Sequence, residues 1–97
     1  MPELDVIIHQ PVRLRIMAAL TSLGPREQVD FGYLREKLGL TDGNLGSHLR
    51  ALEDAGYVVV EKTFVERRPK TFLTVSPAGR KAFGTHVAAL QAIIKPG

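Results

Sequence analysis

The chain has 97 residues, 44% of them hydrophobic and 24% charged, which predicts one globular domain with a modest core, and its net charge of +3 permits nucleic-acid binding without requiring it. It contains no cysteine, which excludes a disulfide scaffold, a zinc finger and a thiolate-based metal or redox sensor. No apolar run approaches the roughly 20 residues of a membrane helix, and the first residues lack a basic region and a cleavage site, so a cytoplasmic protein is expected.

Residues 1–24 predict a short apolar arm followed by a helix. The arm is apolar at Leu4, Val6, Ile7 and Ile8. An arm this hydrophobic must pack on its own domain or on a second copy of the chain. Pro11 suits the first position of the helix, and Gly24-Pro25 is expected to end it. The buried stripe of this helix is predicted at Val12, Ile16, Leu20 and Leu23.

Residues 30–56 predict two helices joined by a tight turn, preceded by a very short strand at Gln28-Val29. Asp30 and Thr41 are suited to cap the starts of the two helices, and Gly39 and Gly56 can adopt the left-handed conformation past their ends. The apolar residues at helical spacing are Phe31, Leu34 and Leu38 in the first helix and Leu45, Leu49 and Leu52 in the second.

The side of the second helix opposite its leucines is small and polar. At 100° per residue, this side carries Gly43, Ser47, Arg50 and Asp54, with Asn44 and Gly46 at its flanks. Two glycines in an exposed helix cost roughly 1 kcal/mol each relative to alanine, a cost that a close approach to another surface would offset. In a helix-turn-helix the second helix enters the DNA major groove in this way. An ordinary helical hairpin with exposed glycines is the alternative.

Residues 57–76 predict a β-hairpin. The segments YVVVEKTFVE and KTFLTVS are rich in β-branched and aromatic residues and flank the polar break ERRP. Imperfect alternation leaves the register open, and with it the choice of whether Phe64 or Val65 is buried. The only acidic residue between positions 62 and 81 is Glu66, against six basic residues: Lys62, Arg67, Arg68, Lys70, Arg80 and Lys81.

The basic residues of the hairpin tip are expected to contact phosphates or the DNA minor groove, and a solvated turn is the alternative. These tip residues are Arg67, Arg68 and Lys70. Arg80 and Lys81 are candidates for phosphate contacts or plain surface residues.

Ser76-Pro77 predicts the start of a last helix over residues 77–95, stopped by Pro96-Gly97. Its apolar stripe contains Phe83, Val87, Leu90 and Ile94, widened by Ala82, Ala89 and Ile93. Few other helices are available to cover this stripe, so a homodimer is favoured over an intramolecular core. The expected dimer interface is Leu4, Ile8, Val12, Phe83, Val87, Leu90 and Ile94.

Side-chain patterns for catalysis, metal binding or cofactor binding are not found, so no enzyme, metal site or cofactor is expected. Ser47 and His48 point about 100° apart on one helix and cannot act as nucleophile and base. His48 lies about 60° from the centre of the leucine stripe and is expected to pack between helices or to contact a phosphate. His9 and His86 are isolated in the sequence.

The element order is helix, short strand, helix, helix, strand, strand, helix, a mainly α arrangement with a small β-hairpin. The chain resembles compact winged helix-turn-helix transcriptional regulators of the MarR/ArsR-like type. The resemblance is carried by PVRLRIMAAL at 11–20, VDFGYLREKLGLTDGNLGSHLRALEDAGYVVVEK at 29–62 and RRPKTFLTVSPAGRKAF at 67–83.

The resemblance implies a recognition helix over residues 42–55, a wing whose tip is 66–70, and a homodimer built by the terminal helices. Its groove-facing residues would be Thr41, Gly43, Asn44, Ser47 and Arg50. The cysteines of ArsR-like metal sensors are absent, and the residues do not identify a small-molecule effector. The expected function is a homodimeric repressor bound to a pseudo-palindromic DNA operator. The alternatives are a winged-helix protein-interaction module and a non-specific architectural DNA-binding protein.

Overall fold

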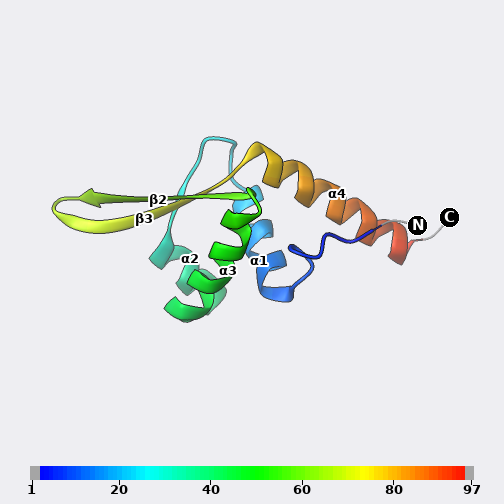
Figure 1. Ribbon diagram of the computed structural model, residues 1–97, viewed down its shortest axis with the longest axis horizontal. Coiled ribbons are helices and arrows are strands. Elements are labelled where there is room, and N and C mark those ends of the chain that lie inside the picture. The colour runs from blue at the N-terminus through cyan, green and yellow to red at the C-terminus, as the bar shows by residue number, and fades with distance from the viewer. Residues whose placement is uncertain (1–2, 96–97) are drawn as a thin grey trace.

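Two extensions leave a central group of three short helices in opposite directions (Figure 1). The computed structural model describes residues 3–95, with principal extents of 55 × 25 × 21 Å. The central helices are α1 (Pro11–Thr21), α2 (Phe31–Leu38) and α3 (Asp42–Asp54). The extensions are the hairpin of β2 (Val58–Val65) and β3 (Arg68–Val75) on one side and α4 (Pro77–Ile94) on the other. This order confirms the predicted winged-helix fold.

Local capping interactions set the ends of the helices. The Asp30 carboxylate accepts a hydrogen bond from the Tyr33 amide, and the Thr41 hydroxyl accepts one from the Asn44 amide at 3.1 Å. Gly39 has a φ of 68°, in the left-handed region that glycine enters at little cost. These contacts confine the turn between α2 and α3 to three residues, 39–41.

Helix α1 ends earlier than the sequence predicts, and α4 ends at Ile94. Helix α1 ends at Thr21, before the expected stop at Gly24-Pro25, and the amide of Ser22 bonds back to the carbonyl of Ala18. Pro96 and Gly97, expected to stop α4, lie outside the described residues. Within residues 3–95, no helix is both long and apolar enough to span a membrane.

The apolar core lies where α1, α2 and α3 meet the base of the sheet. Each central helix contributes the leucine, isoleucine or methionine side chains of one face. The buried core residues are Ile8, Ile16, Met17, Leu20, Leu34, Leu45, Leu49, Leu52, Val58, Leu73 and Val75. All three leucines predicted for α3 are among them, so the opposite face of this helix is turned outward.

The sheet has three antiparallel strands in the order β1-β3-β2, in which β1 (Val29–Asp30) pairs with the base of β3. The connection between β2 and β3 is a two-residue turn, Glu66-Arg67, with φ values of 51° and 68°. Two central residues with positive φ match the right-handed twist of a hairpin, although glycine or asparagine usually fills them. The expected four-residue break is therefore too long, since Arg68 already pairs with Val65.

Neither candidate for burial in the hairpin is buried. Phe64 is 73% exposed and Val65 is 42% exposed. The reason is the length of the hairpin, which extends beyond the helices so that no core lies under its outer half (Figure 1).

The N-terminal arm packs on its own chain. Ile8 is 0% exposed and belongs to the core. The Asp5 carboxylate accepts hydrogen bonds from the Ile7 amide and from the Tyr57 hydroxyl, the latter at 2.6 Å, and the Asp5 amide donates to Nδ1 of His86 at 3.1 Å. Burial alone would raise the pKa of Asp5, but the hydrogen bond from Tyr57 and those from nearby amides outweigh it and lower that pKa. His86, expected to be isolated, is thus part of the arm's attachment.

Gly79 joins α4 to the start of the hairpin. A Cβ atom at this position would lie 2.1 Å from the carbonyl oxygen of Tyr57, which also accepts a hydrogen bond from the Ser76 amide. Only a residue without a side chain allows the helix and the strand to approach this closely. A Cβ at position 79 would clash with a backbone atom of Tyr57, so rotating a side chain could not relieve the clash.

We therefore expect Gly79→Ala to lower the free energy of unfolding by about 3 kcal/mol, because the added methyl group forces α4 away from Tyr57. Gly46→Ala is the matched control, since a Cβ at Gly46 meets no atom within 4 Å. That change should raise the free energy of unfolding by about 0.5–1 kcal/mol. Urea unfolding at one protein concentration measures both, and a Gly79→Ala protein as stable as the original would contradict the contact.

Candidate nucleic-acid interface

The outer face of α3 is solvent-exposed along the first three turns. Gly43, Asn44, Ser47 and Arg50 are all exposed, whereas the leucines on the other side of the helix are buried. The polar face predicted from the helical spacing is therefore available to a partner. The N-cap residue, Thr41, is exposed beside it.

The two glycines of α3 face open space. A Cβ at Gly43 or at Gly46 would meet no atom within 4 Å, so packing within this chain does not require glycine at either position. Helical glycines without an internal reason cost roughly 1 kcal/mol each. Together they leave the first two turns of α3 narrow, with the backbone accessible to a closely approaching surface.

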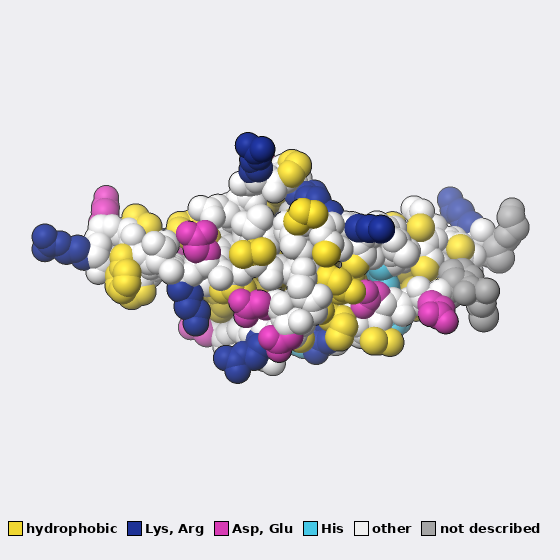
Figure 2. Space-filling model, turned by 45° about the horizontal axis from the view of Figure 1, so that its top comes forward, with side chains coloured by type: hydrophobic (Ala, Val, Ile, Leu, Met, Phe, Trp, Pro, Cys, Tyr) yellow, Lys and Arg dark blue, Asp and Glu magenta, His cyan; other side chains and the backbone are white. Residues whose placement is uncertain are grey.

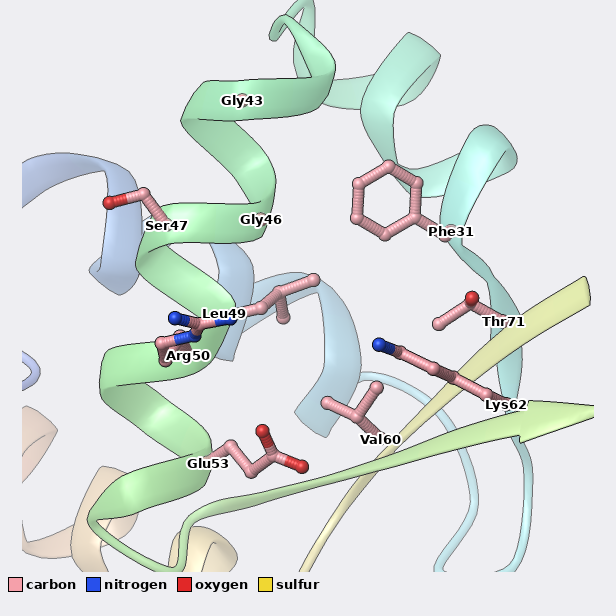
Figure 3. A pocket seen from close by; sticks show the side chains of 10 residues that line it. All are labelled: Phe31, Gly43, Gly46, Ser47, Leu49, Arg50, Glu53, Val60, Lys62 and Thr71. Carbon is pink, nitrogen blue, oxygen red and sulfur yellow. The ribbon is translucent and has the colours of Figure 1, made fainter.

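A groove separates α3 from the hairpin (Figure 3). It encloses about 500 Å³, and its walls carry Gly43, Gly46 and Arg50 on the helix side and Lys62 and Thr71 on the strand side. The ammonium group of Lys62 points across the groove toward α3. The lining also includes one carboxylate, that of Glu53, against the two cations Arg50 and Lys62. The groove is therefore concave with a net positive lining, which can accommodate a phosphate backbone.

Sequence reasoning counted Lys62 among the basic residues but did not place it or Thr71 in the site. The register supplies the reason, because Lys62 lies directly opposite Thr71 in the hairpin. Both are at even spacing from the core pair Val60 and Leu73, so they point to the same face of the sheet. Counting outward by two from Val58, the buried valine of β2, would have found Lys62 once the register was known.

Contacts from α2 hold the start of α3 in position. Nη1 of Arg35 donates to the Asp42 carboxylate at 2.6 Å, across the turn between the two helices. Nη2 of Arg15 donates to the carbonyl oxygen of Leu38 at 2.7 Å and so caps the end of α2. The presentation of the outer face of α3 therefore depends on side chains that do not themselves lie on it.

The predicted basic tip divides into free and engaged side chains. Arg67 and Arg68 are exposed at the end of the hairpin. Lys70 lies 3.5 Å from the Asp30 carboxylate, so its charge is partly balanced within the chain. The guanidinium of Arg80 donates to the carbonyl oxygens of Thr21 and Leu23, at 3.1 and 2.6 Å. Arg80 therefore caps the end of α1, and the phosphate contact considered for it is not supported.

His48 lies between helices. Its Nδ1 accepts a hydrogen bond from Nε of Arg13 on α1 at 3.1 Å, and Arg13 also donates to the carbonyl oxygen of Ile7. An acceptor at Nδ1 requires the neutral imidazole. Burial, together with the Arg13 cation, lowers the pKa of His48 and favours the same form. Of the two roles expected for His48, the geometry matches packing between helices.

The expected dimer residues occupy the end of the molecule away from the hairpin, with one difference. Ile8 is fully buried by its own chain and has no surface left for a second copy. Ile94 is 72% exposed and its neighbour Ile93 is 49% exposed. The others are half-buried: Leu4, Val12, Phe83, Val87 and Leu90.

A helix-turn-helix whose second helix exposes a narrow polar face beside a basic hairpin defines a protein of the winged-helix DNA-binding class. The model of the winged helix DNA-binding domain family matches residues 12–94. The chain belongs to this family, and its hairpin is the wing.

Relatives agree with this assignment. An uncharacterized protein of Methanocaldococcus jannaschii is 39% identical over 89 residues, which cover 92% of this chain and 94% of that protein. The transcriptional regulator homologue protein from Pyrococcus horikoshii OT3 is 36% identical, with a TM-score of 0.81, over 91% of this chain and 84% of that chain.

Two further solved structures share the fold. HlyU from Vibrio cholerae is 20% identical, with a TM-score of 0.62, over 94% of this chain and 86% of its own. NadR in complex with 4-hydroxyphenylacetate is 24% identical, with a TM-score of 0.67, over 91% of this chain and 62% of its own. At these identities the likeness concerns the fold alone.

The free energy of unfolding is expected to depend on pH, because His48 is neutral in the folded chain. The pKa values of His48 and His86 are both lowered by burial, so near the ordinary value of about 6.5 the unfolded chain binds protons that the folded chain does not. Stability should therefore fall as the pH drops from 7 to 5. One histidine contributes at most about 1.4 kcal/mol per pH unit.

His48→Asn keeps an oxygen acceptor for Arg13 but cannot titrate, so this variant should lose less stability over the same pH range. The dependence due to His86 should persist. Urea unfolding at several pH values measures the slope for both proteins. Identical slopes would show that His48 does not titrate with unfolding.

Proposed function

We propose that this protein is a homodimeric, sequence-specific transcriptional regulator of the MarR/ArsR-like type, with α3 in the DNA major groove and the wing on phosphates or the minor groove. The observation that carries the proposal is the narrow start of α3, where Gly43 and Gly46 lie on one wall of a groove whose other wall holds Lys62. A surface of this shape fits a duplex, since a close backbone approach and a basic wall are both useful against phosphates.

Three side chains on the exposed face of α3 are suited to reading bases. Asn44 can pair with adenine through its amide, Arg50 can donate two hydrogen bonds to guanine, and Ser47 can bond either donors or acceptors. Their position in the first three turns matches the part of a recognition helix that reaches base edges. Arg67 and Arg68 supply charge at the tip, where phosphates or a narrow minor groove would attract them.

A second copy of the chain is proposed to cover the apolar end of α4. Ile93 and Ile94 are exposed there, and Val87 and Leu90 are half-buried on the same helix. Burying this surface against itself around a two-fold axis would point the two recognition helices at successive major grooves. Occupation of a promoter by two winged helices would be enough to block transcription, so repression is the proposed mode of action.

Selection of bound sequences from random duplexes tests specificity and symmetry together. The expected result is a pseudo-palindrome with half-site centres about 34 Å apart, the pitch of B-DNA. The Ile94→Glu variant is the control, since a charge in the proposed dimer surface should reduce the motif to one half-site. If the protein binds duplexes but no motif is selected, the result would support architectural binding. If it binds no duplex even at low salt, the result would favour a protein-interaction module.

Substitutions separate positioning contacts from base contacts. Arg67→Ala with Arg68→Ala should weaken binding to every sequence and reduce the salt dependence by about one phosphate contact for each lost arginine. Asn44→Ala or Arg50→Ala should instead reduce discrimination at one position by about 1–3 kcal/mol.

The charge-matched control for the wing variant is Arg26→Ala with Lys37→Ala, which removes two exposed cations that lie outside both the groove and the proposed dimer surface. Affinity for the selected duplex and for a scrambled duplex is measured across a salt series. Equal losses in the wing variant and in this control would mean that the wing makes no contact of its own.

A further inference from the structure

The outer end of the wing carries an exposed apolar pair. Phe64 is 73% exposed and lies directly opposite Pro69, which is also exposed. Val65 and Arg68 flank the two-residue turn, and hydrogen-bonded and non-hydrogen-bonded pairs alternate along antiparallel strands. Phe64 and Pro69, the next pair, therefore form a non-hydrogen-bonded pair, in which the backbone N–H and C=O groups point away from the partner strand and the side chains lie close together. This arrangement also explains the proline, because its missing N–H is not needed between the strands. The ring of Phe64 is thus backed by a rigid neighbour.

The pair points to the same side of the wing as the groove. Side chains alternate along a strand, so Phe64 shares a face with Lys62, and Pro69 shares one with Thr71. Lys62 and Thr71 line the groove facing α3. Phe64 and Pro69 therefore extend this wall outward, toward the end of the wing.

Charges around the pair favour a polyanion as its partner. Arg67 and Arg68 are exposed beside it, and Figure 2 shows basic and hydrophobic side chains together at the end of the wing. Glu66 also lies in the turn, but the two arginines outweigh its single negative charge, so the end of the wing remains net positive. The wing also projects away from the end of α4, so a second copy docked on α4 would not cover it (Figure 1).

We propose that Phe64, supported by Pro69, is an apolar wedge that enters the DNA minor groove and unstacks one base step beside the sequence read by α3. The proposal rests on the DNA-binding function proposed above. Phenylalanine and proline side chains placed between base pairs break base stacking and kink the duplex, a cost that additional protein contacts offset. Steps that unstack easily, such as TA and CA, would then be preferred under the wing without any hydrogen bond to their bases.

The test uses the full chain and the selected duplex, with 2-aminopurine placed in turn at each step of the flanking minor groove. The fluorescence of this base rises when it is unstacked. With protein at saturation, the wild type should raise it severalfold at one step in each half-site, whereas Phe64→Ala should abolish the rise and Phe64→Leu should keep part of it. Val65→Ala is the matched control, since Val65 is exposed on the opposite face of the same hairpin.

Four outcomes decide the proposal. A rise that Phe64→Ala removes and Val65→Ala keeps supports the wedge. A duplex that is bound but shows no rise at any step overturns the wedge and leaves the DNA-binding function intact. A rise unaffected by Phe64→Ala assigns unstacking to another residue and also overturns it. Failure of the wild type to bind the duplex removes both the wedge and the function on which it rests.

Discussion

The burial of one side of α3 is the constraint on which the molecule depends. Leu45, Leu49 and Leu52 are at most 3% exposed, and this fixes the rotation of the helix about its axis. With that rotation set, the opposite face can only point outward, and its small residues determine how closely another surface can approach. The remaining elements either complete the core beneath these leucines or hold the wing beside the exposed face.

Features that depend on neighbouring residues could be predicted from the sequence. Asp30, Thr41 and Ser76 cap the helices that follow them, and Gly39 ends the helix before it, as the local pattern indicated. In each case the residue and its hydrogen-bond partner are three or four positions apart. The burial of the leucines of α3 follows from the same short-range periodicity.

Features that depend on distant partners could not be predicted. The sequence shows Arg80 and Lys70 as part of one basic segment, but their partners, the carbonyl of Leu23 and the carboxylate of Asp30, come from segments about 40 to 60 positions earlier. The hairpin register was also open, because both faces of β2 carry apolar residues. The two-residue turn sets the register and so decides which face of β2 is buried. Glu66-Arg67 lacks the glycine that usually indicates such a turn.

Arginine has two separate uses in this fold. Arg15 and Arg80 donate to carbonyl oxygens at the ends of α2 and α1, where the last carbonyl oxygens of a helix lack amide partners within the helix. Those on the wing and on α3 have exposed side chains. Net charge alone therefore overstates the charge available to a polyanion, and the geometry of each guanidinium decides its role.

The attachment of the N-terminal arm has a consequence for how the chain reaches its final state. Asp5 bonds to His86, 81 positions away, and to Tyr57, 52 positions away. The contact with His86 cannot form until α4 is synthesised, and loops this long are slow to close. Complete docking of the arm therefore requires the last helix, and amide hydrogen exchange at residues 5–9 is expected to proceed faster than in the helices that it covers.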